Sequence, residues 1–291
     1  MSRSSSTKKV AKSLHQDFGM KHQWLFRSAA YFMGYRRPNA VKVKIEKGMS
    51  IFDVLKLLVK NKRQTVNLVI RSGWSRKQLI QYLSSKLEPD AESLNSAFRE
   101  KDVLDSFGVS EAGLLTLFIP DTYNLYYAAT PKEILQRCAT RASEFWRTQG
   151  VSVDSALQVY TLASIVEKES QRADERPIIA GVYLNRLKKG MKLQADPTVN
   201  YAIGEWRALY YKDLNVESPY NTYKYKGLPP GPICTASAQA IESVLHPATH
   251  DYLFFVARGD GSGYHRFSVS DAEHYRNVAL RKKELSASRR F

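Results

Sequence analysis

Hydrophobic and polar residues alternate in two short stretches of the N-terminal third, and a helical pattern follows each of them. Residues 41–45 alternate in the manner of a half-buried strand, and residues 51–60 then carry the spacing of an amphipathic helix. The same order recurs in residues 66–70 and 75–87, with a turn at Gly73 between them. Units of about 25 residues are too small to be stable alone, so we expect the two units to share one core.

These two units resemble LysM modules, which bind N-acetylated sugars in other proteins. Units this short carry little information about the fold, so a packing platform without a sugar site explains the pattern equally well. The segment before them, residues 1–40, is basic and poor in pattern. We expect a tail there with one short helix that stops before Pro38.

Helical patterns dominate the second half of the chain. Thr130 and Glu133 form a capping box, and the helix that it begins should run to Gly150. Two further helices are predicted over about residues 152–170 and 174–190, where apolar side chains recur at helical spacing.

A β-hairpin is predicted late in the chain. Residues 252–257 and 264–269 read as strands, and the residues between them are rich in glycine. Ser270 and Glu273 then form the capping box of a final helix. Because the glycine cluster lies between strands and lacks the spacing of a phosphate-binding loop, it does not indicate a nucleotide site.

The predicted fold class is α+β, with small LysM-like strand and helix units followed by a mainly helical domain with a late β-hairpin. A hydrophobic content of 43% is enough for a substantial core in a chain of 291 residues. The expected segments are a basic N-terminal segment (1–40), a LysM-like region (41–90), a connecting segment (91–130) and the mainly helical domain (131–291).

The net charge points to a polyanionic partner. Lys and Arg outnumber Asp and Glu by 44 to 28, which gives a formal net charge of +16. Nucleic acid, anionic lipid head groups and the acidic cell wall would all attract such a chain. The basic residues gather near both ends, however, which argues against one organised nucleic-acid groove. No run of about 18 apolar residues is present, so the sequence predicts no membrane span.

The cysteines and histidines do not indicate a metal site. Cys138 and Cys234 are too few for a disulfide framework and lack metal-binding spacing, so we expect buried free thiols. His246 and His250 are four residues apart, but a proline lies between them and no HExxH motif occurs. We therefore expect no metal.

Glu169 breaks the apolar pattern of the second predicted helix. Leu162, Ile165, Val166 and Glu169 lie on one helical face, so this carboxylate occupies a position where an apolar side chain is expected. Removal from water raises the pKa of a carboxyl group, and a general acid that works near neutral pH needs such a shift. Glu167 should point to the other side of the helix.

From the pattern alone, an ion pair near the helix end is the more common explanation of such a glutamate. The segments that follow change this view, because they are rich in polar and aromatic residues that suit the lining of a groove. Flat rings that can stack on sugar faces are Trp206, Tyr210, Tyr211, Tyr220, Tyr223 and Tyr225.

Five segments give the chain a specific resemblance. In order, they are FIPDTYNLYYAATPKEIL, LASIVEKES, VYLNRLKKGMKLQADPTVNYAIG, PYNTYKYKGLPPGPI and HPATHDYLFFVA. Together they resemble the MltG or YceG-like family of endolytic peptidoglycan transglycosylases, from about Val41 to the final helix. In that family the catalytic glutamate is the second of an E-K-E triplet, which corresponds to Glu169 here.

A looser analogy concerns substrate binding. Gln194 and the neighbouring Tyr220 and Asn221 are similar to the M-Q and Y-N motifs of soluble lytic transglycosylases. By this analogy the three side chains would hold the sugar beside the scissile bond. Asp196, which precedes a proline, is more simply explained as an N-cap. A role limited to stabilising a turn would also explain Asn221.

The resemblance also implies a mechanism. One carboxylic acid, Glu169, would protonate the oxygen that links N-acetylmuramic acid to N-acetylglucosamine, and the resulting carboxylate would then help to form a 1,6-anhydro ring, with no cofactor. The main alternative is a non-catalytic peptidoglycan-binding protein, and a nucleic-acid binder ranks far behind.

Partners and localisation follow from the resemblance alone. Glycan strands are the expected partner, with peptidoglycan synthases as further candidates and no nucleic acid. Members of the family usually begin with a transmembrane anchor, which is not recognisable in this chain. Membrane association, with the catalytic domain facing the periplasm or cell wall, is therefore an expectation from the family.

Overall fold

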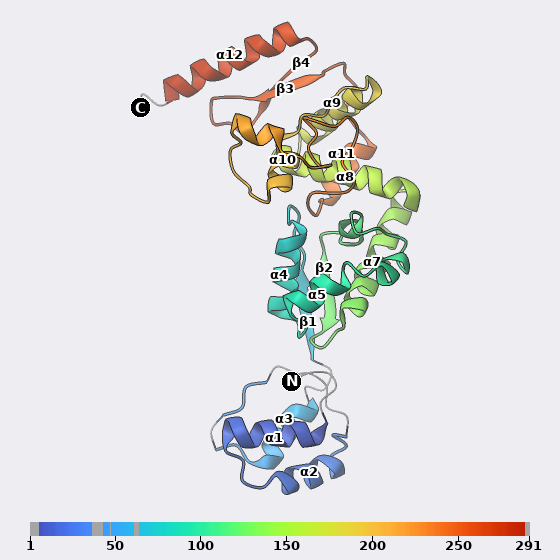
Figure 1. Cartoon of the computed structure of the whole chain (residues 1–291), viewed down its shortest axis with the longest axis vertical. Coiled ribbons are helices and arrows are strands. Elements are labelled where there is room, and N and C mark those ends of the chain that lie inside the picture. The colour runs from blue at the N-terminus through green and yellow to red at the C-terminus, as the bar shows by residue number, and fades with distance from the viewer. Residues whose placement is uncertain (1–5, 37–42, 47, 61–63, 289–291) are drawn as a thin grey trace. The chain divides into compact units, whose positions relative to one another are not determined.

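Figure 1 shows the computed structural model, which describes residues 6–36, 43–46, 48–60 and 64–288. The chain folds into two compact units whose segments alternate along the sequence. The first unit comprises residues 1–69, 79–103 and 122–137, and the second comprises residues 70–78, 104–121 and 138–291.

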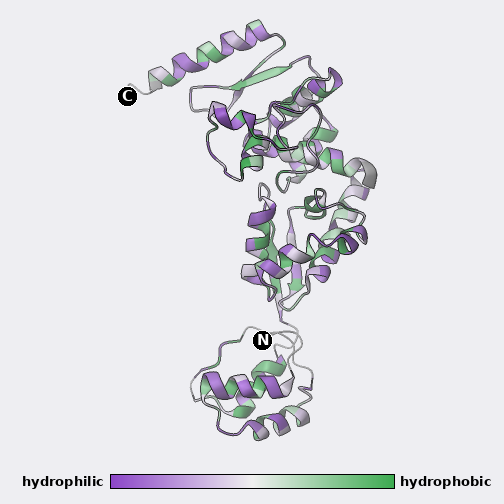
Figure 2. Ribbon diagram, in the orientation of Figure 1, coloured by the Kyte–Doolittle hydropathy of each residue, from purple (hydrophilic) through white to green (hydrophobic). Residues whose placement is uncertain are grey.

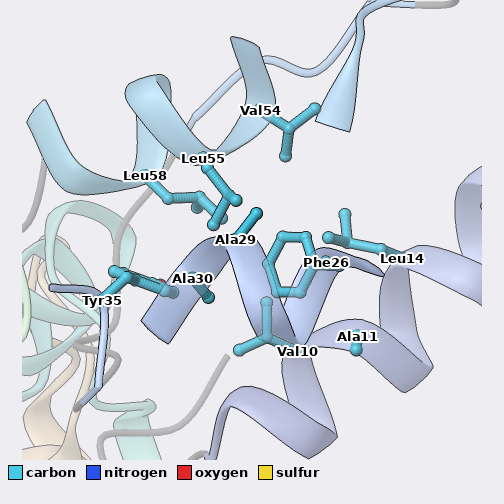
Figure 3. Packing of buried hydrophobic residues seen from close by; sticks show 10 residues of the cluster. All are labelled: Val10, Ala11, Leu14, Phe26, Ala29, Ala30, Tyr35, Val54, Leu55 and Leu58. Carbon is cyan, nitrogen blue, oxygen red and sulfur yellow. The ribbon is translucent and has the colours of Figure 1, made fainter. Parts of the chain in front are cut away.

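Three helices of the first unit pack around one apolar cluster (Figure 3). They are α1 (Thr7–Phe18), α2 (Gln23–Phe32) and α3 (Ile51–Lys60). The buried members of the cluster are Val10, Ala11, Leu14, Phe26, Ala29, Ala30, Tyr35, Val54, Leu55 and Leu58. The prediction of a single short helix before residue 38 is wrong. Gly19 ends α1 in the left-handed conformation, with φ 69°, and a second apolar face then begins at Phe26.

A two-stranded sheet forms the other part of the first unit. β1 (Thr65–Val69) pairs antiparallel with β2 (Thr122–Tyr126), which places Leu68 opposite Tyr123. The helix α4 (Arg76–Lys86) begins after β1, so the strand and helix predicted for the second repeated unit are confirmed. Two short helices, α5 (Ala91–Ala97) and α6 (Lys101–Asp105), follow before β2.

The first repeated unit differs from the prediction. Residues 43–46 do not form the expected strand, and residues 41 and 42 lie outside the described residues. Its helix α3 packs against α2, whereas β1 pairs with a strand beyond residue 90. Non-local packing therefore separates two segments that look alike in sequence. The LysM-like assignment of residues 41–90 stays a prediction.

The second unit contains most of the remaining helices and a hairpin. Its elements in the described part of the chain are η1 (Leu114–Leu117), α8 (Val153–Glu169), α9 (Arg176–Lys188), α10 (Asp196–Ile203), η2 (Tyr211–Asn215), α11 (Ala238–Leu245), β3 (Phe254–Ala257), β4 (His265–Ser268), α12 (Asp271–Ser288) and the greater part of α7 (Pro131–Thr148). The three helices predicted after residue 130 and the late hairpin are confirmed. Thr130 caps α7 as expected, and Ser152 caps α8.

The helix α8 lies against α9, α10, α11 and η1. Its apolar residues Leu162, Ile165 and Val166 are buried. The buried hydroxyl of Tyr160 donates to the carbonyl of Phe118 at 2.8 Å and accepts from the main-chain nitrogen of Ala236 at 3.1 Å. These contacts fix the position of α8, and with it the residue at its C-terminal end.

The hairpin of β3 and β4 packs against α12. Glu284 on α12 accepts a hydrogen bond from the main-chain nitrogen of Gly259 at 2.7 Å and forms an ion pair with Arg266 of β4. Figure 2 shows hydrophobic and hydrophilic residues interspersed along α12 and the other helices. None of the described helices has both the length and the apolar character that a membrane crossing requires.

Gly181 allows a close contact between α9 and the segment before the hairpin. A Cβ atom at this position would lie 2.6 Å from Nε2 of His250 and 2.7 Å from the carbonyl oxygen of Ala248. His250 is itself held, because its Nε2 atom is 2.9 Å from the carbonyl oxygen of Ile178. The absence of a side chain at residue 181 therefore sets how closely α9 approaches this segment.

We expect Gly181→Ala to lower the free energy of unfolding by about 1–3 kcal/mol, since the clash outweighs the better helix propensity of alanine. Urea denaturation followed by tryptophan fluorescence measures this. Lys188→Ala, at the exposed end of the same helix, is the control and should change stability by less than about 0.5 kcal/mol. Equal stability of Gly181→Ala and the unchanged protein would contradict the role given to this contact.

Candidate active site

A cavity of about 630 Å³ in the second unit contains the residue that breaks the apolar pattern. The end of α8, the helices α9, α10 and α12, and the hairpin all contribute to its lining. Its polar lining includes Glu169, Tyr183, Arg186, Gln194, Asp196, Tyr223, His265, Asp271 and His274. Phe254 and Phe255 of β3 supply apolar rings. Such a mixture of rings and convergent polar groups is typical of a ligand site.

Glu169 is the last residue of α8 and is half-buried in the wall of this cavity. It lies on the helical face expected from the sequence, beyond Ile165 and Val166. Burial raises the pKa of its carboxyl group from 4.5 to about 7. A hydrogen bond from Tyr183 and the charge of Arg186 lower this pKa, and the charge of Asp196 raises it.

Tyr183 holds the carboxyl group of Glu169. Its hydroxyl donates a hydrogen bond to Oε1 of Glu169, and its ring is 1% exposed. Burial and the neighbouring carboxylate raise the pKa of Tyr183 well above 10, so the phenol keeps its proton at neutral pH. Phe255 packs edge-on against the ring at 5.8 Å. The tyrosine is therefore a fixed donor on one side of the catalytic candidate.

Glu167 has a different task, as its position on the helix predicted. It forms an ion pair with Arg176 at 3.3 Å, and both side chains are less than a tenth exposed. It also accepts hydrogen bonds from the main-chain nitrogen and the hydroxyl of Ser237, at 3.1 and 2.5 Å. These bonds connect α8, α9 and the start of α11, so Glu167 supports the fold and is not among the residues that line the cavity.

Asp196 brings another carboxylate into the cavity, which the sequence pattern did not indicate. It is the first residue of α10, whereas the N-cap is Ala195, so its prediction as the N-cap is wrong. The hydroxyl of Tyr223 donates to its Oδ1 atom at 2.5 Å. Burial and this bond to a carboxylate raise the pKa of Tyr223. Glu169 and Asp196 are thus each held by one tyrosine.

Gln194 lies in the same cavity as Glu169, as its assignment to substrate binding requires. Its backbone has φ 51°, an uncommon value for a residue with a side chain. Its Oε1 atom accepts a hydrogen bond from Arg186 at 3.2 Å. Arg186 also donates to the carbonyls of Leu193 and Leu253, at 2.8 and 2.6 Å, so its cation is fixed beside the cavity.

Tyr220 and Asn221 are placed elsewhere. Asn221 is fully buried, and its amide donates to the carbonyls of Leu214 and Val216, each at 2.9 Å. The ring of Tyr220 packs on that of Tyr201 at 4.6 Å. Neither residue is part of the cavity lining, so the geometry gives no support to their predicted contact with the sugar. Asn221 Oδ1 instead accepts from the main-chain nitrogen of Tyr223 and helps to place that ring.

The cysteines and His250 behave as structural residues. Cys138 and Cys234 are buried free thiols, as expected, and burial raises the pKa of Cys234 to about 12. His250 bonds to the main chain through both ring nitrogens. No group of three His, Cys, Asp or Glu side chains that could hold a metal is found in the part of the chain that the structure describes.

Comparison with known proteins agrees with the motifs. The model of the YceG-like family matches residues 1–280. The chain belongs to the YceG-like family.

Similar YceG-like proteins carry informative names. The chain is 49% identical over 108 residues to the endolytic murein transglycosylase of Bacillus subtilis (strain 168), which covers 37% of this chain and 30% of that protein. It is 30% identical over 312 aligned positions to the endolytic murein transglycosylase of Streptococcus pneumoniae serotype 2 (strain D39), which covers 94% of this chain and 56% of that protein. This YceG-like chain therefore matches little more than half of the Streptococcus protein and less than a third of the Bacillus protein.

The crystal structure of a YceG-like protein from Listeria monocytogenes supports the fold. The two structures superpose with a TM-score of 0.65 at 26% sequence identity, over 95% of this chain and 96% of the other. The two proteins thus share the arrangement of helices and small antiparallel sheets, and the resemblance seen in the sequence motifs is confirmed.

The raised pKa of Glu169 predicts a measurable link between pH and stability. The folded chain holds the Glu169 proton with a pKa of about 7, against 4.5 for an unperturbed glutamate. The free energy of unfolding should therefore decrease as the pH rises from about 4.5 to 7, by up to about 3 kcal/mol. The glutamine of Glu169→Gln cannot ionise, so this variant should not lose stability through that group as the pH rises. Its free energy of unfolding relative to the unchanged protein should therefore increase from pH 4.5 to about 7. Parallel stability curves for the two proteins between pH 4 and 8 would contradict the assigned pKa.

Proposed function

We propose that this YceG-like chain is a lytic transglycosylase that cleaves peptidoglycan between N-acetylmuramic acid and N-acetylglucosamine, with Glu169 as both acid and base. The observation that carries the proposal is the carboxyl group of Glu169, held by Tyr183 in a cavity where its pKa is about 7. The names of the relatives, endolytic murein transglycosylases, supply the substrate class.

In the first step, the protonated carboxyl group of Glu169 donates its proton to the glycosidic oxygen. The bond from this oxygen to C1 of N-acetylmuramic acid breaks, and the N-acetylglucosamine strand leaves with a new hydroxyl group. A pKa near 7 suits this step, because a useful fraction of the group is protonated at neutral pH while the proton remains transferable. Arg186 and the Tyr183 hydroxyl then stabilise the carboxylate that remains.

In the second step, the Glu169 carboxylate removes the proton of the muramoyl C6 hydroxyl. The C6 oxygen bonds to C1, a 1,6-anhydro ring closes, and Glu169 is again protonated. Since the nucleophile belongs to the bound sugar, its effective concentration far exceeds that of an external reactant. No water is consumed, and the two steps regenerate the enzyme.

Asp196 supports a second candidate function, that of a hydrolase. Ordinary glycosidases use two carboxylates, and Asp196 lies in the same cavity as Glu169. The hydrogen bond from Tyr223 occupies its Oδ1 atom and fixes its orientation. We assign Asp196 the task of raising the pKa of Glu169, and product analysis decides between the two functions.

The wider setting belongs to the same proposal. The chain acts on glycan strands at the bacterial cell envelope, in association with the membrane and with peptidoglycan synthases, and residues 41–90 help to hold the glycan. The names of the relatives support the envelope substrate. The alternative, a non-catalytic peptidoglycan-binding protein, would show glycan binding without cleavage.

Glu169→Gln should abolish release of soluble fragments from purified peptidoglycan, with a loss of at least about a thousandfold, because the amide keeps the shape but has no transferable proton. Glu167→Gln is the matched control. It weakens the bonds to Arg176 and Ser237, so it should lower thermal stability and leave cleavage measurable at a permissive temperature. Equal loss of activity in both folded variants would refute the assignment of Glu169.

The product ends distinguish ring closure from hydrolysis. Digestion in heavy-oxygen water should give muramoyl ends that are 1,6-anhydro, non-reducing and free of label, as mass spectrometry can show. Asp196→Asn should give the same ends, with the alkaline limb of its pH–rate profile moved to lower pH, because removal of the negative charge lowers the pKa of Glu169. Labelled reducing ends in the unchanged protein would identify a hydrolase instead.

A further inference from the structure

A carboxylate–histidine pair lies close to the catalytic candidate and has no part in the mechanism above. Glu175, the N-cap residue of α9, accepts two hydrogen bonds from His265 of β4. The main-chain nitrogen of His265 donates to Oε1 and the ring Nδ1 to Oε2, each at 2.8 Å. The two side chains are 6% and 10% exposed. The ring of His265 is therefore fixed in one orientation.

The bond to Glu175 determines which ring nitrogen remains available. A carboxylate accepts hydrogen bonds, so Nδ1 of His265 carries a proton, and neutral imidazole then has a lone pair at Nε2. Within the described residues Nε2 of His265 has no hydrogen-bond partner, and it is not among the polar atoms that are both fully buried and unpartnered. His265 also lines the Glu169 cavity. Nε2 is thus an acceptor without a protein partner, on a residue of the cavity wall.

A series of ring contacts connects His265 to the carboxyl group of Glu169. The ring of Phe255 packs edge-on against His265 at 5.4 Å and against Tyr183 at 5.8 Å. Tyr183 in turn donates its hydrogen bond to Glu169. One apolar ring therefore lies between the tyrosine that holds the acid and the histidine, which places His265 on the neighbouring part of the same wall.

We infer that His265 is a substrate-binding residue of this site, whose Nε2 atom accepts a hydrogen bond from a hydroxyl or acetamido N–H group of the bound glycan, and that Glu175 is its positioning residue. The inference rests on the proposed function for the class of ligand. If His265 only held the hairpin in place, the bonds from its main-chain nitrogen and Nδ1 would be enough. A role in sugar binding also explains why Nε2 is left without a protein partner near Glu169.

Two substitutions of His265 separate these roles, because each reproduces one ring nitrogen. In His265→Asn the side-chain amide nitrogen takes the place of Nδ1 and can still donate to Glu175, but no atom reaches the position of Nε2. In His265→Gln the amide group extends to the position of Nε2 and can accept a hydrogen bond there. Glu175→Gln keeps the ring and weakens the interaction that orients it.

The binding experiment uses the full chain with Glu169→Gln as the background and soluble oligosaccharides of alternating N-acetylglucosamine and N-acetylmuramic acid as the probe. Isothermal titration calorimetry should show about tenfold weaker binding for His265→Asn, the loss expected for one hydrogen bond, with little change in melting temperature. His265→Gln should recover part of this affinity. With Glu169 restored, His265→Asn should raise KM more than it lowers kcat.

The remaining outcomes refute one proposal or both. Unchanged affinity in a stable His265→Asn variant means that the histidine only holds the hairpin in place. A parallel loss of stability and affinity that His265→Gln does not relieve has the same meaning. Either result overturns the inference and leaves the proposed function intact. Failure of the Glu169→Gln background to bind the oligosaccharides overturns both. Cleavage by Glu169→Gln overturns the catalytic assignment, while the affinities still decide the role of His265.

Discussion

The carboxyl group of Glu169, kept out of bulk water and held by Tyr183, is the constraint around which the second unit is organised. Desolvation raises the pKa of this carboxyl group, because a carboxylate is less stable away from water. The surrounding structure must be rigid to keep the group in this unfavourable environment. The rigidity comes from α8, which packs against several neighbouring elements, and from α9, which carries Tyr183 and approaches its neighbours closely at Gly181. The stability of these contacts and the chemistry of the site therefore depend on each other.

The charged and polar groups around the cavity have opposite effects on the pKa of Glu169. Asp196 raises the pKa of Glu169, while Arg186 and the Tyr183 hydroxyl lower it. A stronger desolvation without these donors would leave a carboxylic acid that cannot release its proton, and more cations would leave a carboxylate that cannot act as an acid. A group that must serve as acid and then as base within one reaction needs a pKa between these extremes, and the observed balance provides one.

Three glutamates within nine residues show how environment assigns a role to a side chain. Glu167 is neutralised by Arg176 and bonded to Ser237, so it joins helices. Glu175 is committed to His265 and orients its ring. Glu169 has no salt-bridge partner among the described residues and receives a hydrogen bond from a neutral phenol instead. Because its pKa is raised to about 7, Glu169 is the glutamate whose proton can be transferred near neutral pH.

The sequence by itself determined the helices α7 to α9, the late hairpin, the family and the position of Glu169. Each of these follows from caps, periodicity or contiguous motifs, which act over a few residues. Only the tertiary structure decided that β1 pairs with β2 and that α3 joins α1 and α2. It also decided which residues line the cavity of Glu169, where Tyr183, Asp196, Tyr223 and His265 are found and Tyr220 and Asn221 are not. These features join segments far apart in the chain, and local patterns carry no information about which distant segments share a core or a cavity wall.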